Sequence, residues 1–104
     1  MQRFDLQLFL VANLIREGYT LSKKEKLIKR FLSIPKDFTF EELVTLLSYF
    51  GYRVDTKGKS SGSRLEFVSN EHRPIGLHRP HPSNVLKAYQ LRQVLEILES
   101  EDLI

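Results

Sequence analysis

The chain contains no cysteine and no long uninterrupted apolar run. Without cysteine it can hold neither a disulfide framework nor a zinc or iron–sulfur site with thiolate ligands, so its chemistry must use other side chains. The apolar stretch at residues 6–15 is interrupted by Gln7 and Asn13 and is about half the length of a membrane-spanning helix. No small-residue cleavage site follows this stretch, so a secretory signal is a poor interpretation. We therefore expect a cytoplasmic protein.

The overall composition is that of one folded domain. The chain has 104 residues, of which 41% are hydrophobic and 28% charged, and these values are close to the averages for globular proteins. The net charge is only +3, but residues 53–92 hold eight basic and three acidic side chains and all three histidines. A phosphate-binding surface requires such a basic block, although a solvated basic surface has the same composition.

Two segments in the first half of the chain have the spacing of amphipathic helices. In residues 23–32, apolar side chains recur at helical spacing, with lysines and an arginine on the other face. A second helix is predicted over residues 39–50, because Thr39 and Glu42 fit a capping box. Gly51 follows this segment, as is typical of a helix end.

The second half changes to a strand pattern and then returns to a helix. Residues 52–55, 64–68 and 75–78 are strand-like and separated by turn-forming residues, which predicts a three-stranded antiparallel meander. A final helix is expected to begin near Ser83 or Asn84, either of which can cap it. The order helix, helix, three strands, helix predicts an α+β fold with helices packed on one face of the sheet.

Four segments of the chain form a pattern: Gly51-Tyr52 at the start of a predicted strand, the predicted loop at residues 57–63, the predicted strand that ends at His78, and the closing helix with residues 91–95. Together they resemble HicA-type mRNA interferase toxins. The resemblance covers roughly residues 23–104. It implies a fold like the double-stranded-RNA-binding domain, metal-free RNA cleavage without a cofactor, and neutralisation by a HicB-type antitoxin protein.

The chain departs from the family's pattern at one position. The family commonly carries a histidine, taken as catalytic, at or next to the position after a Gly-Ser pair in the second strand, whereas Gly62-Ser63 is followed here by Arg64 and Leu65. The resemblance therefore supports RNA binding and antitoxin pairing more directly than cleavage.

Metal-free RNA cleavage needs a base, an acid and a cation that stabilises the charged phosphorane. Histidine suits the first two roles because its ordinary pKa lies near neutral pH. We assign these roles to His78 and His81, which flank Arg79-Pro80 before the last helix, and we consider His72, in a turn, a weaker candidate. Each histidine could instead fill a loop or contact the antitoxin.

Arg64 is the predicted cation of the site, since a guanidinium grips phosphate with two parallel hydrogen bonds. The alternative is an exposed strand arginine that pairs across the sheet, for example with Asp55. A metal site at the three histidines is disfavoured because Pro80 and Pro82 do not fit the frames that usually present such ligands.

The remaining candidates are RNA-binding side chains. A loop rich in ammonium and hydroxyl groups, and the segment that leads into the last helix, contribute Lys57, Lys59, Ser61, Ser63, Arg79 and Lys87. Loops of this kind also serve as ordinary hairpin connections, and a lysine such as Lys87 can simply be solvated.

Three functions remain to be compared. The leading interpretation is a toxin-like endoribonuclease that acts on mRNA and pairs with a HicB-type antitoxin, with no membrane and no small-molecule cofactor. The alternative is a binding module of the same fold that holds RNA or the antitoxin without cutting. A DNA-binding adaptor ranks last, because no helix-turn-helix with a basic recognition helix is evident.

Residues 1–20 are expected to lie outside the functional domain, which we place at residues 21–104. Translation from a codon near Leu21 would make the extension a mis-annotated start. The alternative is that Leu6, Phe9, Leu10 and Leu14 pack as an additional helix, because an exposed apolar segment favours aggregation.

Overall fold

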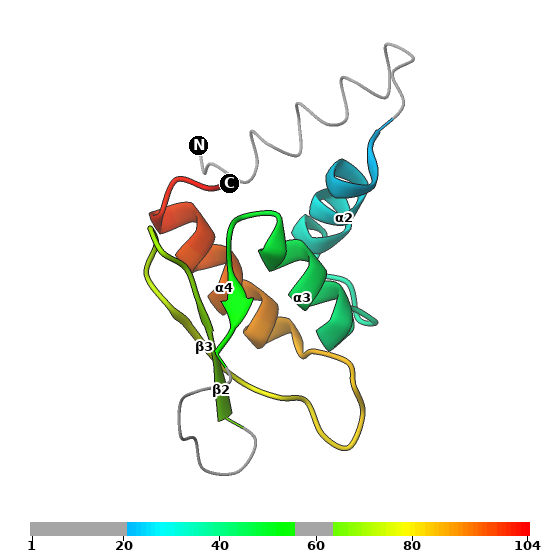
Figure 1. The fold of residues 1–104 in the computed structure, drawn as a ribbon. Helices are drawn as coiled ribbons and strands as arrows, with labels where there is room; N and C mark the ends of the chain where they lie inside the picture. The colour runs from blue at the N-terminus through cyan, green and yellow to red at the C-terminus, as the bar shows by residue number, and fades with distance from the viewer. Residues whose placement is uncertain (1–20, 56–63) are drawn as a thin grey trace.

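The structure, a computed structural model, describes residues 21–55 and 64–104. Its elements are α2 (Lys23–Leu32), α3 (Phe40–Ser48), β1 (Arg53–Val54), β2 (Arg64–Val68), β3 (Ile75–His78) and α4 (Ala88–Ser100) (Figure 1). The predicted α+β order is confirmed, and it is consistent with a double-stranded-RNA-binding-domain-like fold. The predictions for residues 1–20 and for the loop at 56–63 fall outside the described residues.

The sheet is an antiparallel meander in the order β1-β2-β3. Between β2 and β3, Arg64 pairs with His78 and Phe67 with Ile75. Since side chains alternate along a strand, these pairs lie on opposite faces of the sheet. Phe67 and Ile75 are buried under the helices, whereas Arg64 and His78 are exposed. One face therefore completes the core and the other is left for solvent or a ligand.

The core is built from the apolar stripes of the helices against the buried face of the sheet. Leu43, Leu46 and Leu47 of α3, and Leu91, Val94 and Leu98 of α4, are almost completely buried. These residues recur at three- and four-residue spacing, so each helix buries one face. Gly51, in the turn between α3 and β1, has a φ of 85°, in the left-handed region that favours glycine.

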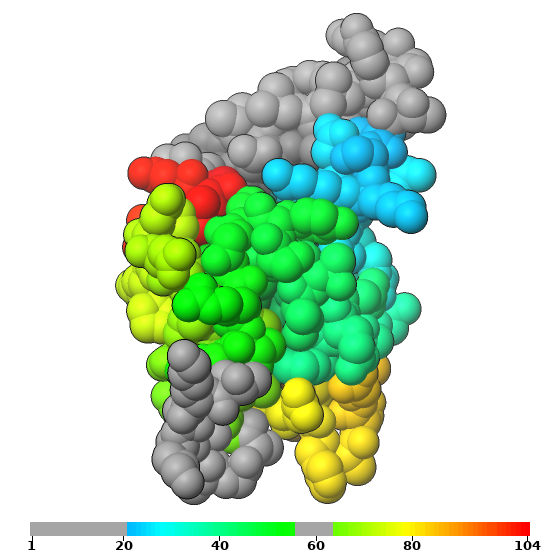
Figure 2. Space-filling view, in the orientation of Figure 1, coloured from blue at the N-terminus to red at the C-terminus, as the bar shows by residue number. Residues whose placement is uncertain are grey.

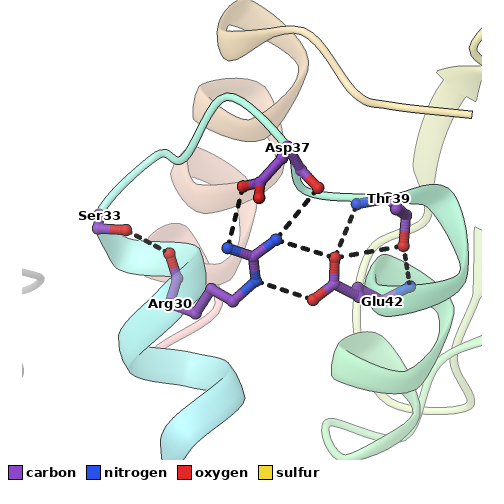
Figure 3. Close-up of polar contacts among 5 residues, drawn as sticks. All are labelled: Arg30, Ser33, Asp37, Thr39 and Glu42. Carbon is purple, nitrogen blue, oxygen red and sulfur yellow. Dashed lines mark hydrogen bonds and ion pairs between the residues drawn. The ribbon is translucent and has the colours of Figure 1, made fainter. Parts of the chain in front are cut away.

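The connection between α2 and α3 is held by a network around Arg30 (Figure 3). Arg30 donates to Glu42 from Nε at 2.8 Å and from Nη2 at 3.1 Å, and its Nη1 lies 3.0 Å from an Asp37 carboxylate oxygen. Glu42 also accepts the Thr39 backbone N–H at 3.0 Å, while Glu42 N–H donates to Thr39 Oγ1. This confirms the predicted capping box and ties it to the preceding helix.

The network shifts the titration of both main partners. Hydrogen bonds from Arg30 hold the pKa of Glu42 at about 2, against a contribution from burial that acts in the opposite direction. The same pairing raises the pKa of Arg30 further above its usual range. Both groups are therefore charged at neutral pH and remain paired there.

A second polar cluster anchors the turn between β2 and β3 to the end of α4. His72 Nδ1 lies 3.1 Å from Glu101 Oε1, which also accepts the Arg73 backbone N–H at 3.2 Å. The bonds from Arg73 and His72 lower the pKa of Glu101. Tyr52 donates its hydroxyl to the Arg73 carbonyl at 2.8 Å, and burial, together with Glu101, raises the pKa of Tyr52. His72 thus has a structural role.

The start of α4 differs from the prediction. Neither Ser83 nor Asn84 caps the helix, because α4 begins at Ala88 with Lys87 as its N-cap residue. Asn84 instead bonds Glu41 through its side chain and accepts the Phe40 N–H at its carbonyl. A pairing across the chain has replaced the local cap, and sequence spacing does not report such a pairing.

The segment between β3 and α4 projects from one end of the molecule (Figure 2, yellow). Its later part is held by backbone hydrogen bonds to the start of α3, from Phe40 N–H to the Asn84 carbonyl and from Leu86 N–H to the Phe38 carbonyl.

Within residues 21–55 and 64–104, no helix is long and apolar enough to cross a membrane.

We predict that Glu42→Gln destabilises the fold by about 1–2 kcal/mol, because it removes the carboxylate from both the cap and the Arg30 pair. Glu42 has a lowered pKa, so its contribution is complete above the ordinary glutamate pKa of 4.5 and disappears as the pH falls toward 2. Urea unfolding as a function of pH measures this difference. Glu96→Gln, which changes an exposed glutamate of α4, is the control. A gap between wild type and Glu42→Gln that stays constant from pH 7 to pH 3 would contradict the assignment.

Candidate functional site

Arg64 and His78 lie side by side at one end of the exposed sheet face. They are direct partners in the register of β2 and β3, and directly opposed residues of an antiparallel pair have Cβ atoms about 5 Å apart. Both are exposed. Within the described residues, Arg64 has no ion-pair partner, and its register partner is His78 rather than Asp55. The sheet therefore presents a permanent cation next to an imidazole.

Gly76 determines where the Arg64 guanidinium lies. A Cβ added at Gly76 would stand 3.2 Å from Arg64 Nη2, so the guanidinium lies over the backbone of β3. A glycine inside a strand often marks a place where another group approaches closely. A side chain at position 76 would require the guanidinium to shift by a few tenths of an ångström.

His78 also lines an open hollow of about 450 Å³ between the end of the sheet and the start of α4. The hollow is formed by the segment after β3 and the first turn of α4; its lining residues are His78, Arg79, Pro80, His81, Pro82, Ser83, Val85, Lys87, Tyr89 and Gln90. The two predicted catalytic histidines and two predicted RNA-binding side chains, Arg79 and Lys87, thus meet at one place.

Gln90 connects the two sides of this hollow. Its side chain is buried, with 5% exposed. Its Nε2 donates to the His78 carbonyl at 3.0 Å, and its Oε1 accepts the Lys87 backbone N–H at 3.0 Å. One amide therefore fixes the end of β3 relative to the first turn of α4, and it satisfies one of the free backbone donors at the helix start.

Arg79 is held by an aromatic ring. Its guanidinium carbon lies 4.6 Å from the centroid of Phe40, a geometry in which a cation is attracted to the ring face. Phe40 is buried and packs near Phe67, with ring centroids 6.1 Å apart. The arginine remains exposed, so its charge is oriented by the fold without being neutralised by a carboxylate.

The electrostatics of the hollow favour an anion. Among its described lining residues, Arg79 and Lys87 are cations, and none is Asp or Glu. The start of α4 adds the positive end of a helix dipole on the same side, since Lys87, Tyr89 and Gln90 belong to its first turn. A phosphate entering the hollow therefore meets favourable charge from both the side chains and the backbone.

Other predicted residues are placed elsewhere. His72 contacts Glu101 and Tyr52 rather than the hollow, and within the described ranges no group of three or more potential ligands could hold a metal. Lys57, Lys59, Ser61 and Ser63 lie outside the described residues.

Gly76 and Gln90 are site residues that the sequence analysis did not single out. Gly76 is an isolated glycine between Ile75 and Leu77 in a strand pattern, which could have been read as a position of close approach. Gln90 lies one turn before Val94 on the buried side of α4, where a polar residue needs a partner. Neither signal identifies which side chain approaches Gly76 or which groups Gln90 bonds.

A family model described as the HicA toxin of bacterial toxin–antitoxin systems matches residues 40–99. The match covers more than half of the chain. The chain belongs to the HicA toxin family. No curated protein and no solved structure gives a match. The resemblance seen in the sequence is thereby confirmed, and the matched HicA region contains both the Arg64–His78 pair and all the residues that line the hollow.

Family membership identifies the chain as the toxin member of a toxin–antitoxin partnership. In this HicA chain, the strand position where the resemblance places a histidine carries Arg64, and its cross-strand partner is itself a histidine, His78. Imidazole and guanidinium are thus both present at this end of the sheet, on adjacent strands.

We predict that Gln90→Leu destabilises the fold by about 1–3 kcal/mol, because the His78 carbonyl and the Lys87 N–H both lose a part-buried hydrogen-bond partner. Chemical unfolding monitored by circular dichroism measures the change. Gln93→Leu, at an exposed position of the same helix, is the matched control and should change stability by less than about 0.5 kcal/mol. Equal effects of the two variants would show that the bridge contributes nothing.

Proposed function

We propose that the chain is a metal-independent endoribonuclease that cleaves mRNA as the toxin of a type II pair and is neutralised by a HicB-type antitoxin. The observation that carries this proposal is that His78 and His81 line one hollow with no carboxylate among its described lining residues, and that Arg64 is the register partner of His78 on the neighbouring strand. Family membership supports the toxin role, and the site supports the chemistry.

The chain's own side chains meet the chemical requirements of RNA cleavage. One histidine removes the proton from the 2′-hydroxyl, which then attacks the adjacent phosphorus, and the other protonates the 5′-oxygen as it leaves. His78 and His81 are the pair that lines the hollow. Arg64, beside His78, stabilises the negative charge that develops on the phosphorane. The products are a 2′,3′-cyclic phosphate and a free 5′-hydroxyl, and no step requires a metal.

RNA binding is assigned to the basic side chains around this site. Arg79 and Lys87 line the hollow, and the sequence adds Lys57, Lys59, Ser61 and Ser63 from the loop that leads into β2. Contacts of this type hold the RNA backbone and carry little sequence information. We assign this function to a single domain of residues 21–104, with residues 1–20 outside it.

The second candidate is a module of the same fold that binds RNA or the antitoxin without cleaving. Arg64 favours it, because this arginine occupies the strand position where the resemblance places a catalytic histidine, and a guanidinium cannot act as a base at neutral pH. The two functions differ in a single measurement, the cleavage of RNA by the purified chain.

RNA affinity should fall steeply with salt, because binding by basic side chains releases counterions from the phosphates. Lys87→Ala should reduce the slope of log affinity against log salt by about 0.7–1. Lys26→Ala, which removes an exposed lysine of α2 outside the hollow, should leave the slope unchanged. Fluorescence anisotropy with labelled RNA at several salt concentrations provides the measurement, and a flat dependence would contradict the proposal.

Cleavage should persist in EDTA and should be lost in the His78→Ala, His81→Ala double variant, because acid–base catalysis contributes about 10²–10⁴-fold. Arg64→Ala should slow cleavage by about 10²–10³-fold, as expected for the loss of a group that stabilises the transition state. Gel analysis of end-labelled RNA gives rates and product ends, and growth arrest on induction gives toxicity.

His72→Gln is the control for these variants, since His72 is tied to Glu101 outside the hollow. It should leave the cleavage products unchanged as long as the protein is folded. Cleavage that survives in the double histidine variant would show that the assignment of base and acid is wrong. If the wild type cleaves no RNA, the binding module is the correct function.

A further inference from the structure

Tyr89 is a large aromatic side chain left in water at the edge of the hollow. Within the described residues, the large hydrophobic side chains that remain exposed are Tyr89, with 56% exposed, and Tyr49, with 39%. Tyr49 is the C-cap residue of α3 and does not line the hollow, whereas Tyr89 does. The fold therefore leaves the apolar face of Tyr89 uncovered at the one place where the proposed substrate binds.

The backbone that carries the Tyr89 ring is held in place by the neighbouring residue. Tyr89 lies in the first turn of α4, directly before Gln90, whose buried amide fixes this turn to the end of β3. The same hollow carries His78, His81 and Lys87. An aromatic platform on a rigid element is thus surrounded by groups suited to a phosphate and its neighbouring ribose.

A nucleobase is the apolar group that accompanies a phosphate in RNA. Every base presents a flat π-face, and stacking of one base on an aromatic side chain contributes about 1–3 kcal/mol in single-strand binding proteins. The hollow, at about 450 Å³, lies within the size range of sites that bind small organic ligands. In a duplex the bases are already stacked on each other, so only an unpaired base can use the ring.

We propose that Tyr89 forms a stacking subsite for one unpaired nucleobase, next to a phosphate held by Lys87, so that the substrate is single-stranded RNA. This inference rests on the proposed RNA-cleaving function and names its substrate class. The proposed binding mode uses an unpaired base and therefore differs from that of double-stranded-RNA-binding domains, which recognise the shape and backbone of a duplex.

The test uses a labelled RNA octamer with 2′-O-methyl groups, which binds without being cut because the attacking hydroxyl is blocked. Tyr89→Ala should weaken binding of this single strand by about 5- to 150-fold. Tyr89→Phe, which keeps the ring, should bind within about threefold of wild type, and Tyr49→Ala should bind like wild type. The blunt duplex of the same octamer should bind equally well to wild type and Tyr89→Ala.

Two further readouts distinguish stacking from a general loss of structure or charge. The salt dependence of binding should be unchanged in Tyr89→Ala, because the ring carries no charge, whereas Lys87→Ala reduces it. An octamer in which the nucleotide that stacks on Tyr89 lacks its base should bind the wild type more weakly than the intact octamer does. Tyr89→Ala should bind the two octamers equally well. The unfolding midpoint of Tyr89→Ala should match that of the wild type.

The outcomes keep this inference separate from the proposed function. Cleavage by wild type, together with unchanged octamer binding in Tyr89→Ala, would overturn the subsite and leave the nuclease standing. Tyr89-dependent binding without cleavage of unmodified RNA would support the subsite and exclude the nuclease. If Tyr89→Ala weakens only the complex with the antitoxin, the ring serves a protein interface and the subsite is wrong.

Discussion

The hydrogen bonds of one buried amide determine the geometry of the candidate site. Gln90 joins the carbonyl of His78, at the end of β3, to the backbone N–H of Lys87, at the start of α4. The intervening segment leaves the sheet and returns to the helix, so its two ends are held across the hollow. Because an unpaired buried polar group is costly, this bridge favours one arrangement of sheet end and helix start over nearby alternatives. The histidines and cations of the site are presented on this frame.

Two sets of charged side chains among the described residues differ in how they are paired. Arg30, Glu42 and Glu101 are hydrogen-bonded to other elements, and these contacts shift their pKa values. Arg64 and Lys87 lie exposed at the site, and no carboxylate lines the hollow among the described residues. Side chains that complete the fold are thus neutralised by partners, whereas those at the site keep their charge available for a phosphate.

In this HicA family member, Arg64 stands at the strand position where the resemblance places a histidine, and the strand register shows which residue lies opposite it. When one strand lacks a functional side chain, the residue directly opposite it on the neighbouring strand can supply that chemical group. This is possible because directly opposed side chains lie on the same face of the sheet. His78 is that partner here, and His81 follows it three residues later in the lining of the hollow. The candidate site therefore contains a guanidinium and two imidazoles, the groups to which the proposed cleavage assigns the roles of cation, base and acid.

Local patterns in the sequence determined the fold class, the helices and the meander. The capping box at Thr39 and Glu42 and the alternation of β2 depend only on neighbours a few residues apart, and both formed as predicted. The helical spacing predicted α4 as well, but not its start at Ala88. His78, His81 and Lys87 were also named from the sequence, because residue type suggests their chemistry. Arg64 was named because it stands at the strand position where the resemblance places a histidine. Tertiary structure alone decided that Asn84 pairs with Glu41 instead of capping α4, that Gly76 makes room for Arg64, and that Gln90 bridges two elements. Those contacts join residues that are distant in sequence or meet only across strands, and no local pattern encodes such a partner.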